Sequence, residues 1–206
     1  VYDSDLGGRA WLGLVDRRLL GANGSANLLL QLGENARDAQ AQARGYIGGA
    51  RFAPGPIASV RAADETIRRF SPDGAELPGT GVQEATAFLG VEVPIDAAWR
   101  VQVGGMSRWW REPLRGDDDA LGAMVRLERF TAFTAPMLLA ELQATKAYRR
   151  ALLDLRWRGD MGRVRLFPRV RVMVGDSLPA SLTTPLGGLE EGFPGLRFGE
   201  RRGDRE

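Results

Sequence analysis

The chain has 206 residues, and its 28 basic and 26 acidic side chains leave a formal net charge of only +2. It contains neither Cys nor His, which excludes a disulfide framework, a thiolate metal site and the usual general base. Because Arg alternates with Asp and Glu instead of clustering, the charge pattern also argues against nucleic-acid binding.

Gly, Pro, Asn and Asp divide the chain into segments of about ten residues, as expected for a series of strands joined by turns. Most segments alternate apolar and polar residues, and no segment fits a helical period as well. No run approaches the roughly 18 apolar residues of a membrane-spanning helix. We predict ten strands, near residues 9–20, 25–33, 39–52, 57–69, 81–93, 98–111, 120–130, 137–146, 149–158 and 163–174.

The last of these segments has the clearest pattern. Arg163, Arg165, Arg169 and Arg171 alternate with Val and Leu residues, so a continuous strand would have one apolar face and one face of guanidinium groups. The same two-sided pattern recurs along the chain. A soluble sandwich would bury the apolar face in a protein core, whereas a transmembrane barrel would expose it to lipid.

The polar face favours the barrel. A sandwich would need a second sheet over every apolar face, whereas a water-filled lumen accommodates the polar faces of all ten strands at once. We therefore predict an all-β fold, an antiparallel up-and-down transmembrane β-barrel present in part, with about ten strands. It would be a single domain over 1–206, with strands in 9–174 and a loop in 175–206. Arg can pair bidentately with carboxylates in such a lumen, and the predicted lumen contacts are Glu128, Glu141, Asp154, Arg156, Arg169 and Arg171.

Connection lengths suggest an orientation. The connections at 21–24, 53–56, 94–97 and 159–162 are predicted to be short and would lie on the periplasmic side, while 71–80 and 112–119 would be longer external loops. The segment after residue 174 would then emerge outside. Aromatic residues at predicted strand ends would form an interfacial girdle; these are Trp109, Trp110, Phe130, Phe133 and Tyr148.

The last thirty residues break the strand pattern. Gly187-Gly188 is followed by an aromatic, a Gly and an Arg-rich stretch that ends in Arg201-Arg202-Gly203-Asp204. This arrangement resembles the conserved external loop of the bacterial surface antigen superfamily, the outer-membrane barrels that include BamA- and TamA-like assembly factors and two-partner secretion translocators. The beginning of the chain, Tyr2-Asp3-Ser4-Asp5-Leu6-Gly7-Gly8, also resembles the entry into such a barrel.

The resemblance implies that the loop folds back into the lumen. In the family an Arg precedes the loop Gly, but here the matching stretch is Phe193-Pro194-Gly195-Leu196, so Gly195 matches and the Arg does not. The predicted motif residues are Gly187, Gly188, Gly195, Arg197, Arg201, Arg202 and Asp204. The stretches Pro-Gly-Leu-Arg and Glu-Arg-Arg-Gly-Asp are most similar to barrels fused behind patatin-like phospholipase domains.

The resemblance implies a bacterial outer-membrane protein that translocates, inserts or anchors a polypeptide, either a substrate or a fused passenger domain. Its partners would be outer-membrane lipid and that polypeptide, and unpaired sheet edges would allow a homo-oligomer. Such barrels usually have sixteen strands, so we expect this chain, which starts at Val1 without a leader, to be a fragment. The alternative is a soluble antiparallel β-sandwich or barrel that acts as a ligand-binding module.

Catalysis by these residues is not expected. The chain has no Gly-x-Ser-x-Gly nucleophile elbow and no His for a triad, so any phospholipase activity would lie in an upstream domain. The Asp117-Asp118-Asp119 run could hold Ca²⁺ through oxygen ligands, but the favoured interpretation is a solvated loop tip. We predict no metal and no cofactor.

Overall fold

A computed structural model describes most of the chain in segments. They are residues 2–3, 7–16, 18, 24–33, 36–47, 53–70, 76–113, 116–129, 137–157, 159–162, 164–166, 168–179, 182, 184–186 and 201–203. Among these residues, no helix has the length and apolar character to cross a membrane.

The main element is an eleven-stranded sheet in which neighbours in the chain are neighbours in space, in the order β1-β2-β3-β4-β5-β6-β7-β8-β9-β10-β13. Every pairing is antiparallel. The strands are β1 (Tyr2–Asp3), β2 (Gly7–Asp16), β3 (Gly24–Gly33), β4 (Ala36–Gly45), β5 (Gly55–Phe70), β6 (Glu76–Pro94), β7 (Trp99–Glu112), β8 (Gly116–Arg129), β9 (Met137–Thr145), β10 (Arg149–Arg156) and β13 (Arg169–Asp176). The predicted all-β class and up-and-down order of ten long strands are confirmed.

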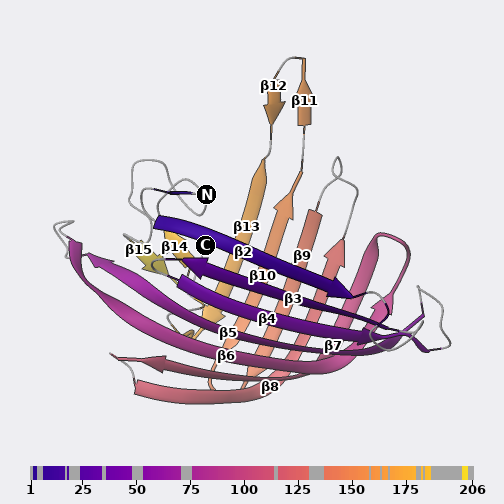
Figure 1. Cartoon of the computed structure of the whole chain (residues 1–206), viewed down its shortest axis with the longest axis horizontal. Helices are drawn as coiled ribbons and strands as arrows, with labels where there is room; N and C mark the ends of the chain where they lie inside the picture. The colour runs from indigo at the N-terminus through magenta and orange to yellow at the C-terminus, as the bar shows by residue number, and fades with distance from the viewer. Residues whose placement is uncertain are drawn as a thin grey trace.

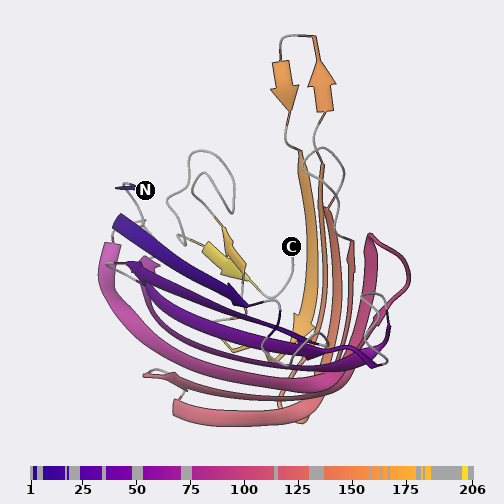
Figure 2. The same ribbon diagram turned by 45° about the vertical axis from the view of Figure 1, so that its right-hand side comes forward.

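Two small hairpins lie outside this order. β11 (Gly159–Met161) pairs with β12 (Val164–Leu166), and β14 (Thr184–Leu186) pairs with β15 (Arg201–Gly203). The β11–β12 hairpin extends the β10–β13 connection beyond the end of the main sheet, while β14 and β15 lie on its concave side (Figures 1 and 2).

The sheet is strongly curved. Its N-terminal wing (β2–β5) and its C-terminal wing (β9, β10 and β13) lie at an angle to each other, and the long strands β6–β8 bend between them (Figure 2). We call the concave side of the sheet the hollow. Among the described residues, no strand pairing joins the β1–β2 edge to β13, so hydrogen bonds do not close the sheet into a ring.

Glycines on the concave face permit this bend. Gly90 in β6 lies opposite Gly104 in β7, and a Cβ on either would collide with backbone atoms of the other strand. A glycine within a strand often marks such a close backbone approach. Gly90 and Gly104 are therefore positions where only glycine lets β6 and β7 approach this closely.

The predicted continuous strand over 163–174 is wrong. The strand is interrupted before Pro168: β12 ends at Leu166 and β13 begins at Arg169. Proline has no N–H to donate to a strand ladder, whereas its carbonyl accepts a hydrogen bond from the Trp157 amide at 3.1 Å. This bond closes the base of the β11–β12 hairpin. Arg165 therefore pairs with Asp160 of β11 along the backbone and lies outside the main sheet.

The predicted loop lengths are also wrong. β7 and β8 extend so far that only residues 113–115 connect them, and β5 and β6 are connected by 71–75. Asp117-Asp118-Asp119 lies within β8, opposite Trp109, Trp110 and Arg111 of β7, instead of at a loop tip. The end predicted to carry external loops therefore has the shorter connections, and the β11–β12 hairpin stands at the opposite end.

Candidate functional site

The two faces of the main sheet differ in chemistry. Successive residues of a strand point to opposite faces, and the strand registers place one set of apolar side chains on the convex face. These side chains are exposed. The set includes Leu12, Leu14, Val60, Leu89, Val91, Val103, Leu121, Val125, Leu142, Leu153, Val170, Val172 and Val174.

The concave face is largely buried and carries charged and polar side chains beside apolar ones, among them a cluster of Ile57, Phe88, Met106 and Met124. A buried charge is costly unless it is paired and hydrogen-bonded, so the partners of these side chains determine whether the hollow is stable. The buried polar residues on this face are Glu84, Glu92, Gln102, Arg108, Glu112, Glu141, Gln143 and Asp154. This hydrogen-bonded wall is the candidate functional site.

Asp154 of β10 is the centre of the first network. Its Oδ1 accepts hydrogen bonds from the Nε atoms of Arg156 and Arg169, each at 3.1 Å. Its Oδ2 accepts from their Nη2 atoms at 3.0 and 2.7 Å. Two guanidinium groups therefore bind one carboxylate, each through two parallel hydrogen bonds, the strongest geometry for such pairs. The contact with Arg169 ties β10 to β13.

Glu141 of β9 is the centre of the second network. It accepts hydrogen bonds from Arg126 Nε of β8 at 2.8 Å, from Arg150 Nη1 of β10 at 3.1 Å and from Gln143 Nε2 at 2.7 Å. The Tyr148 hydroxyl donates to Gln143 Oε1 at 3.0 Å, and burial raises the pKa of this tyrosine, which lies in the β9–β10 turn. One carboxylate thus connects three adjacent strands.

Two glutamates of β6 extend the wall towards the N-terminal wing. Glu92 accepts a hydrogen bond from Gln102 Nε2 at 2.8 Å and lies 3.4 Å from Arg44 Nη1 of β4. Glu84 lies 3.8 Å from both Arg61 Nη1 of β5 and Arg108 Nε of β7. The charges of the hollow are therefore balanced locally, across strands that are neighbours or next neighbours.

An apolar cluster closes one end of the wall. After β13 the chain turns at Ser177, whose φ of 57° lies in the left-handed region, and Leu178 returns to the concave face with 3% exposure. A Cβ on Gly175 would lie 2.6 Å from a methyl carbon of Leu178, so glycine leaves the space for that side chain. We call this group the Leu178 cluster; its buried members are Trp110, Ala120, Tyr148, Leu152, Met173 and Leu178.

All six predicted lumen residues lie on the concave face. Glu141 and Asp154 anchor the two networks, Arg156 and Arg169 both bind Asp154, and Glu128 lies 3.7 Å from Arg126 Nη1. Arg171 is the backbone neighbour of Asp154 in β13. The partners that were not predicted as site residues are Arg44, Arg61, Glu84, Glu92, Gln102, Arg108, Arg126, Gln143, Tyr148 and Arg150. For those in strands, the alternation of polar and apolar residues indicates that the side chains share the polar face. Which residue each one contacts follows only from the strand register.

The loop motif is only partly described. Gly187, Gly188, Gly195, Arg197 and Asp204 lie outside the described residues. Arg201 and Arg202 belong to β15, where their backbones pair with Leu186 and Pro185 of β14. The segment that follows β13 does return to the concave face as far as Leu178.

The predicted aromatic girdle needs correction. Tyr148 is only 2% exposed and Trp110 only 6% exposed, both on the concave side in the Leu178 cluster. Their rings meet edge to face with centroids 6.2 Å apart. They face inward because Trp110 shares its face with Arg108 and Glu112, and because the tight turn directs Tyr148 to Gln143. Phe130 and Phe133 lie outside the described residues.

No protein-family model matches the chain, and no curated protein matches its sequence significantly. Among the described residues, no three His, Cys, Asp or Glu side chains are grouped to hold a metal ion. The two faces of the sheet are therefore the features of the molecule that bear on its function.

Proposed function

We propose that this chain forms part of a bacterial outer-membrane β-barrel that translocates, inserts or anchors another polypeptide. The observation that supports this best is the inverted arrangement of the faces, with apolar side chains exposed on the convex side and ion pairs enclosed on the concave side. Water would be a poor solvent for the convex face, whereas hydrocarbon would suit it.

Strand length supports the same proposal. The strands of the outer parts of the sheet have eight to ten residues, with ten in β2, β3 and β4, nine in β9, and eight in β10 and β13. A barrel strand tilted by about 45° needs roughly 9–11 residues to cross the bilayer. The four strands of nine or ten residues therefore match this thickness, while β10 and β13 are slightly shorter and β5–β8, with 14 to 19 residues, extend beyond it.

The hollow suits a polypeptide better than a small reactive substrate. Its carboxylates are already bound by Arg side chains, as at Asp154 and Glu141, so they are held as acceptors and are poorly suited to act as bases. A wall of alternating fixed charges can contact a passing or anchored chain without fixing one sequence. The Leu178 cluster would narrow one end of this path.

A barrel also requires its edges to be paired. Each unsatisfied backbone polar group in hydrocarbon costs several kcal/mol, so the β2 and β13 edges need neighbouring strands in the membrane. Further strands of the same protein or a second copy could supply these neighbours. Until the edges are paired, they are where the chain would aggregate.

The direct test is the behaviour of the full-length protein that carries this sequence. We expect it to fractionate with bacterial outer membranes, to resist extraction by alkaline carbonate and to need detergent to stay monodisperse. Folded protein should also migrate differently from heated protein on a semi-native gel. A protein that stays monodisperse and folded in plain buffer would overturn the proposal and favour the soluble ligand-binding module.

The polypeptide role needs a separate measurement. A photo-crosslinking amino acid placed at Val15, which is exposed on the concave face, should capture a polypeptide in intact cells, whereas the same probe at Leu14, exposed on the convex face, should not. Membrane insertion without any crosslink at the concave position would leave a membrane barrel but remove the polypeptide role.

A further inference from the structure

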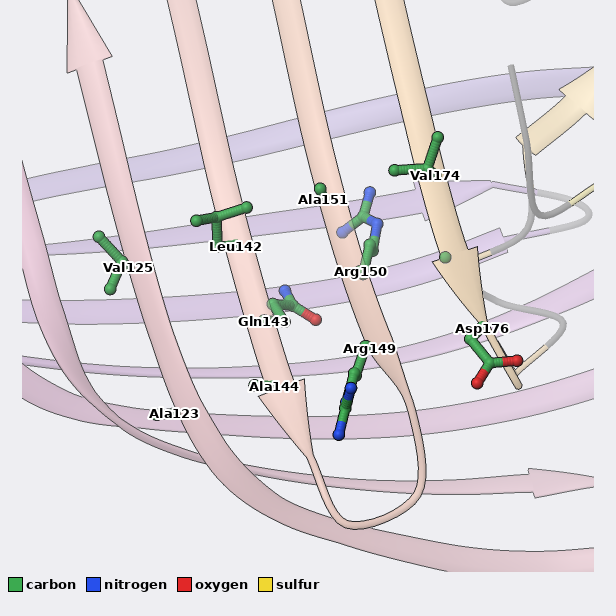
Figure 3. Close-up of a pocket in the computed structure, with 11 residues that line it drawn as sticks. Ala123, Val125, Leu142, Gln143, Ala144, Arg149, Arg150, Ala151, Val174 and Asp176 are labelled. Atoms are coloured by element: carbon green, nitrogen blue, oxygen red, sulfur yellow. The ribbon is translucent and has the colours of Figure 1, made fainter.

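A groove crosses the convex face of the C-terminal wing. It has a volume of about 690 Å³ and runs over β8, β9, β10 and β13 (Figure 3). Alanines form its floor: Ala123 lies opposite Ala144, and Ala151 lies between Leu142 and Val174 of the adjoining strands. A larger side chain at any of the three alanines would fill part of the groove.

The walls are apolar. Val125, Leu142 and Val174 project on the same side of the sheet as the groove (Figure 3), and all three are more than two fifths exposed. A hollow of this composition fits a flexible hydrocarbon chain, because methyl and methylene groups are the only chemistry that its walls offer along most of its length.

One end of the groove carries two opposite charges. Arg149 begins β10 and Asp176 ends β13; they are backbone partners, and both line the groove with exposed side chains. Among the described residues no ion pair joins them, and the carboxylate accepts only a 3.4 Å hydrogen bond from the neighbouring Ser177 hydroxyl. In Figure 3 their side chains point apart, so one cation and one anion stand side by side at the groove mouth without neutralising each other.

We propose that this groove binds a membrane phospholipid with a phosphoethanolamine headgroup. An acyl chain would lie over Ala123, Ala144 and Ala151, the phosphate would accept hydrogen bonds from Arg149, and the ammonium would donate to Asp176. The inference rests on the proposed membrane location, because only a lipid-facing surface would meet such a ligand.

The two charges select the headgroup. A phosphoglycerol headgroup offers the phosphate but places no cation beside Asp176. A phosphocholine headgroup carries a cation whose methyl groups cannot donate a hydrogen bond to a carboxylate. Phosphoethanolamine is the common headgroup class that satisfies both side chains.

The test is native mass spectrometry of the full-length protein in detergent. Phosphatidylethanolamine, phosphatidylglycerol and phosphatidylcholine with identical acyl chains are added at equal concentration, and the retained adducts are counted. We expect wild-type protein to retain phosphatidylethanolamine about tenfold better than either of the others, a ratio typical of one charge-assisted hydrogen bond.

Three variants and one matched control sharpen the test. Ala144→Phe should fill the groove and reduce retention of all three lipids. Arg149→Gln should reduce binding of all three lipids about tenfold, because each carries the phosphate, and Asp176→Asn should remove the preference for phosphatidylethanolamine. Arg111→Gln is the control, because Arg111 is exposed at the same end of the sheet but lies outside the groove.

The outcomes separate this inference from the proposed function. Equal retention of the three lipids by wild type, or unchanged retention in Ala144→Phe and Arg149→Gln, would overturn the groove assignment while the protein still fractionates with membranes. A protein that needs no detergent would instead overturn the membrane location itself. The substituted side chains all lie on the convex face, so we expect each variant to fold. The gel-mobility shift of the wild-type protein checks this for every variant.

Discussion

The two wings of the sheet differ on their concave faces. In the C-terminal wing, Glu141 and Asp154 are buried and each binds two Arg side chains. In the N-terminal wing, the concave positions of β2 and β3 include Val15 and Leu29, which are 70% and 45% exposed. These two strands are therefore apolar on both faces over part of their length.

This difference shows which strands are joined by ion pairs on the concave face. An Arg–carboxylate network needs partners on adjoining strands, and β8, β9, β10 and β13 supply them for one another. β2 and β3 lie next to the sheet edge, where the concave side chains are mostly apolar or neutral. The C-terminal wing should thus be sensitive to loss of charge, and so should β4 and β5, where Arg61 binds Asp38, whereas β2 and β3 should not.

The largest effect is expected when Asp154 is removed. Asp154→Ala would leave Arg156 and Arg169 without their shared carboxylate, and breaking a buried ion pair from one side typically costs about 3–5 kcal/mol. Urea unfolding of the protein in lipid vesicles measures the loss. Asp160→Ala, which lies in β11 outside the main sheet, is the matched control. An equal loss in both variants would contradict the network's role.

The next effect concerns the convex face. Val172→Arg would place a charge in hydrocarbon, which costs about 2–4 kcal/mol near the bilayer centre. In the N-terminal wing, Leu14→Arg should impair membrane insertion more than Val15→Arg, because adjacent residues point to opposite faces at nearly the same depth. The yield of folded protein in membranes compares the variants. If Val15→Arg is as damaging as Leu14→Arg, the assignment of faces in that wing is wrong.

A smaller effect is expected at the Leu178 cluster. Leu178→Ala should destabilise the packing of the segment after β13 by about 2–3 kcal/mol, because a buried leucine is lost and a cavity remains. Hydrogen exchange should then increase at the amides of Ser177 and Leu178 more than in β10. Leu153→Ala, on the exposed convex face, is the comparison, and faster exchange in that variant too would argue against a local packing role.

The smallest effect is expected at Leu29. Leu29→Gln replaces an exposed concave residue in a strand with few charged neighbours, so its effect should stay within about 0.5 kcal/mol. A loss of several kcal/mol in the same urea measurement would mean that Leu29 is covered in the assembled protein. That result would show that the N-terminal wing is completed by another segment or another chain.

The strands themselves were predictable because alternation is a local property. Leu138, Ala140 and Leu142 oppose Glu141 and Gln143 whatever lies beside them, so the sequence alone locates β9 and its two faces. The strand predicted near 57–69 is likewise present, as β5.

Features that depend on strand neighbours were not predictable. Glu141 could have paired with any inward Arg, and only the register brings Arg126 and Arg150 to it. Tyr148 was expected at the membrane–water interface, but its hydroxyl donates a hydrogen bond to Gln143 across the tight β9–β10 turn. The break at Pro168 was hidden because the alternation of Arg and Val continues on both sides of it.

The β11–β12 hairpin marks one end of the sheet, so locating the hairpin in a cell would reveal how the sheet is oriented. It stands beyond the ends of β10 and β13 (Figures 1 and 2) and turns at Gly162, whose φ is 63°. A short epitope inserted at this tip would be displayed away from the wall that carries the ion pairs. Antibody labelling of intact cells would then report which compartment the tip enters, and so the direction in which every strand of the sheet runs.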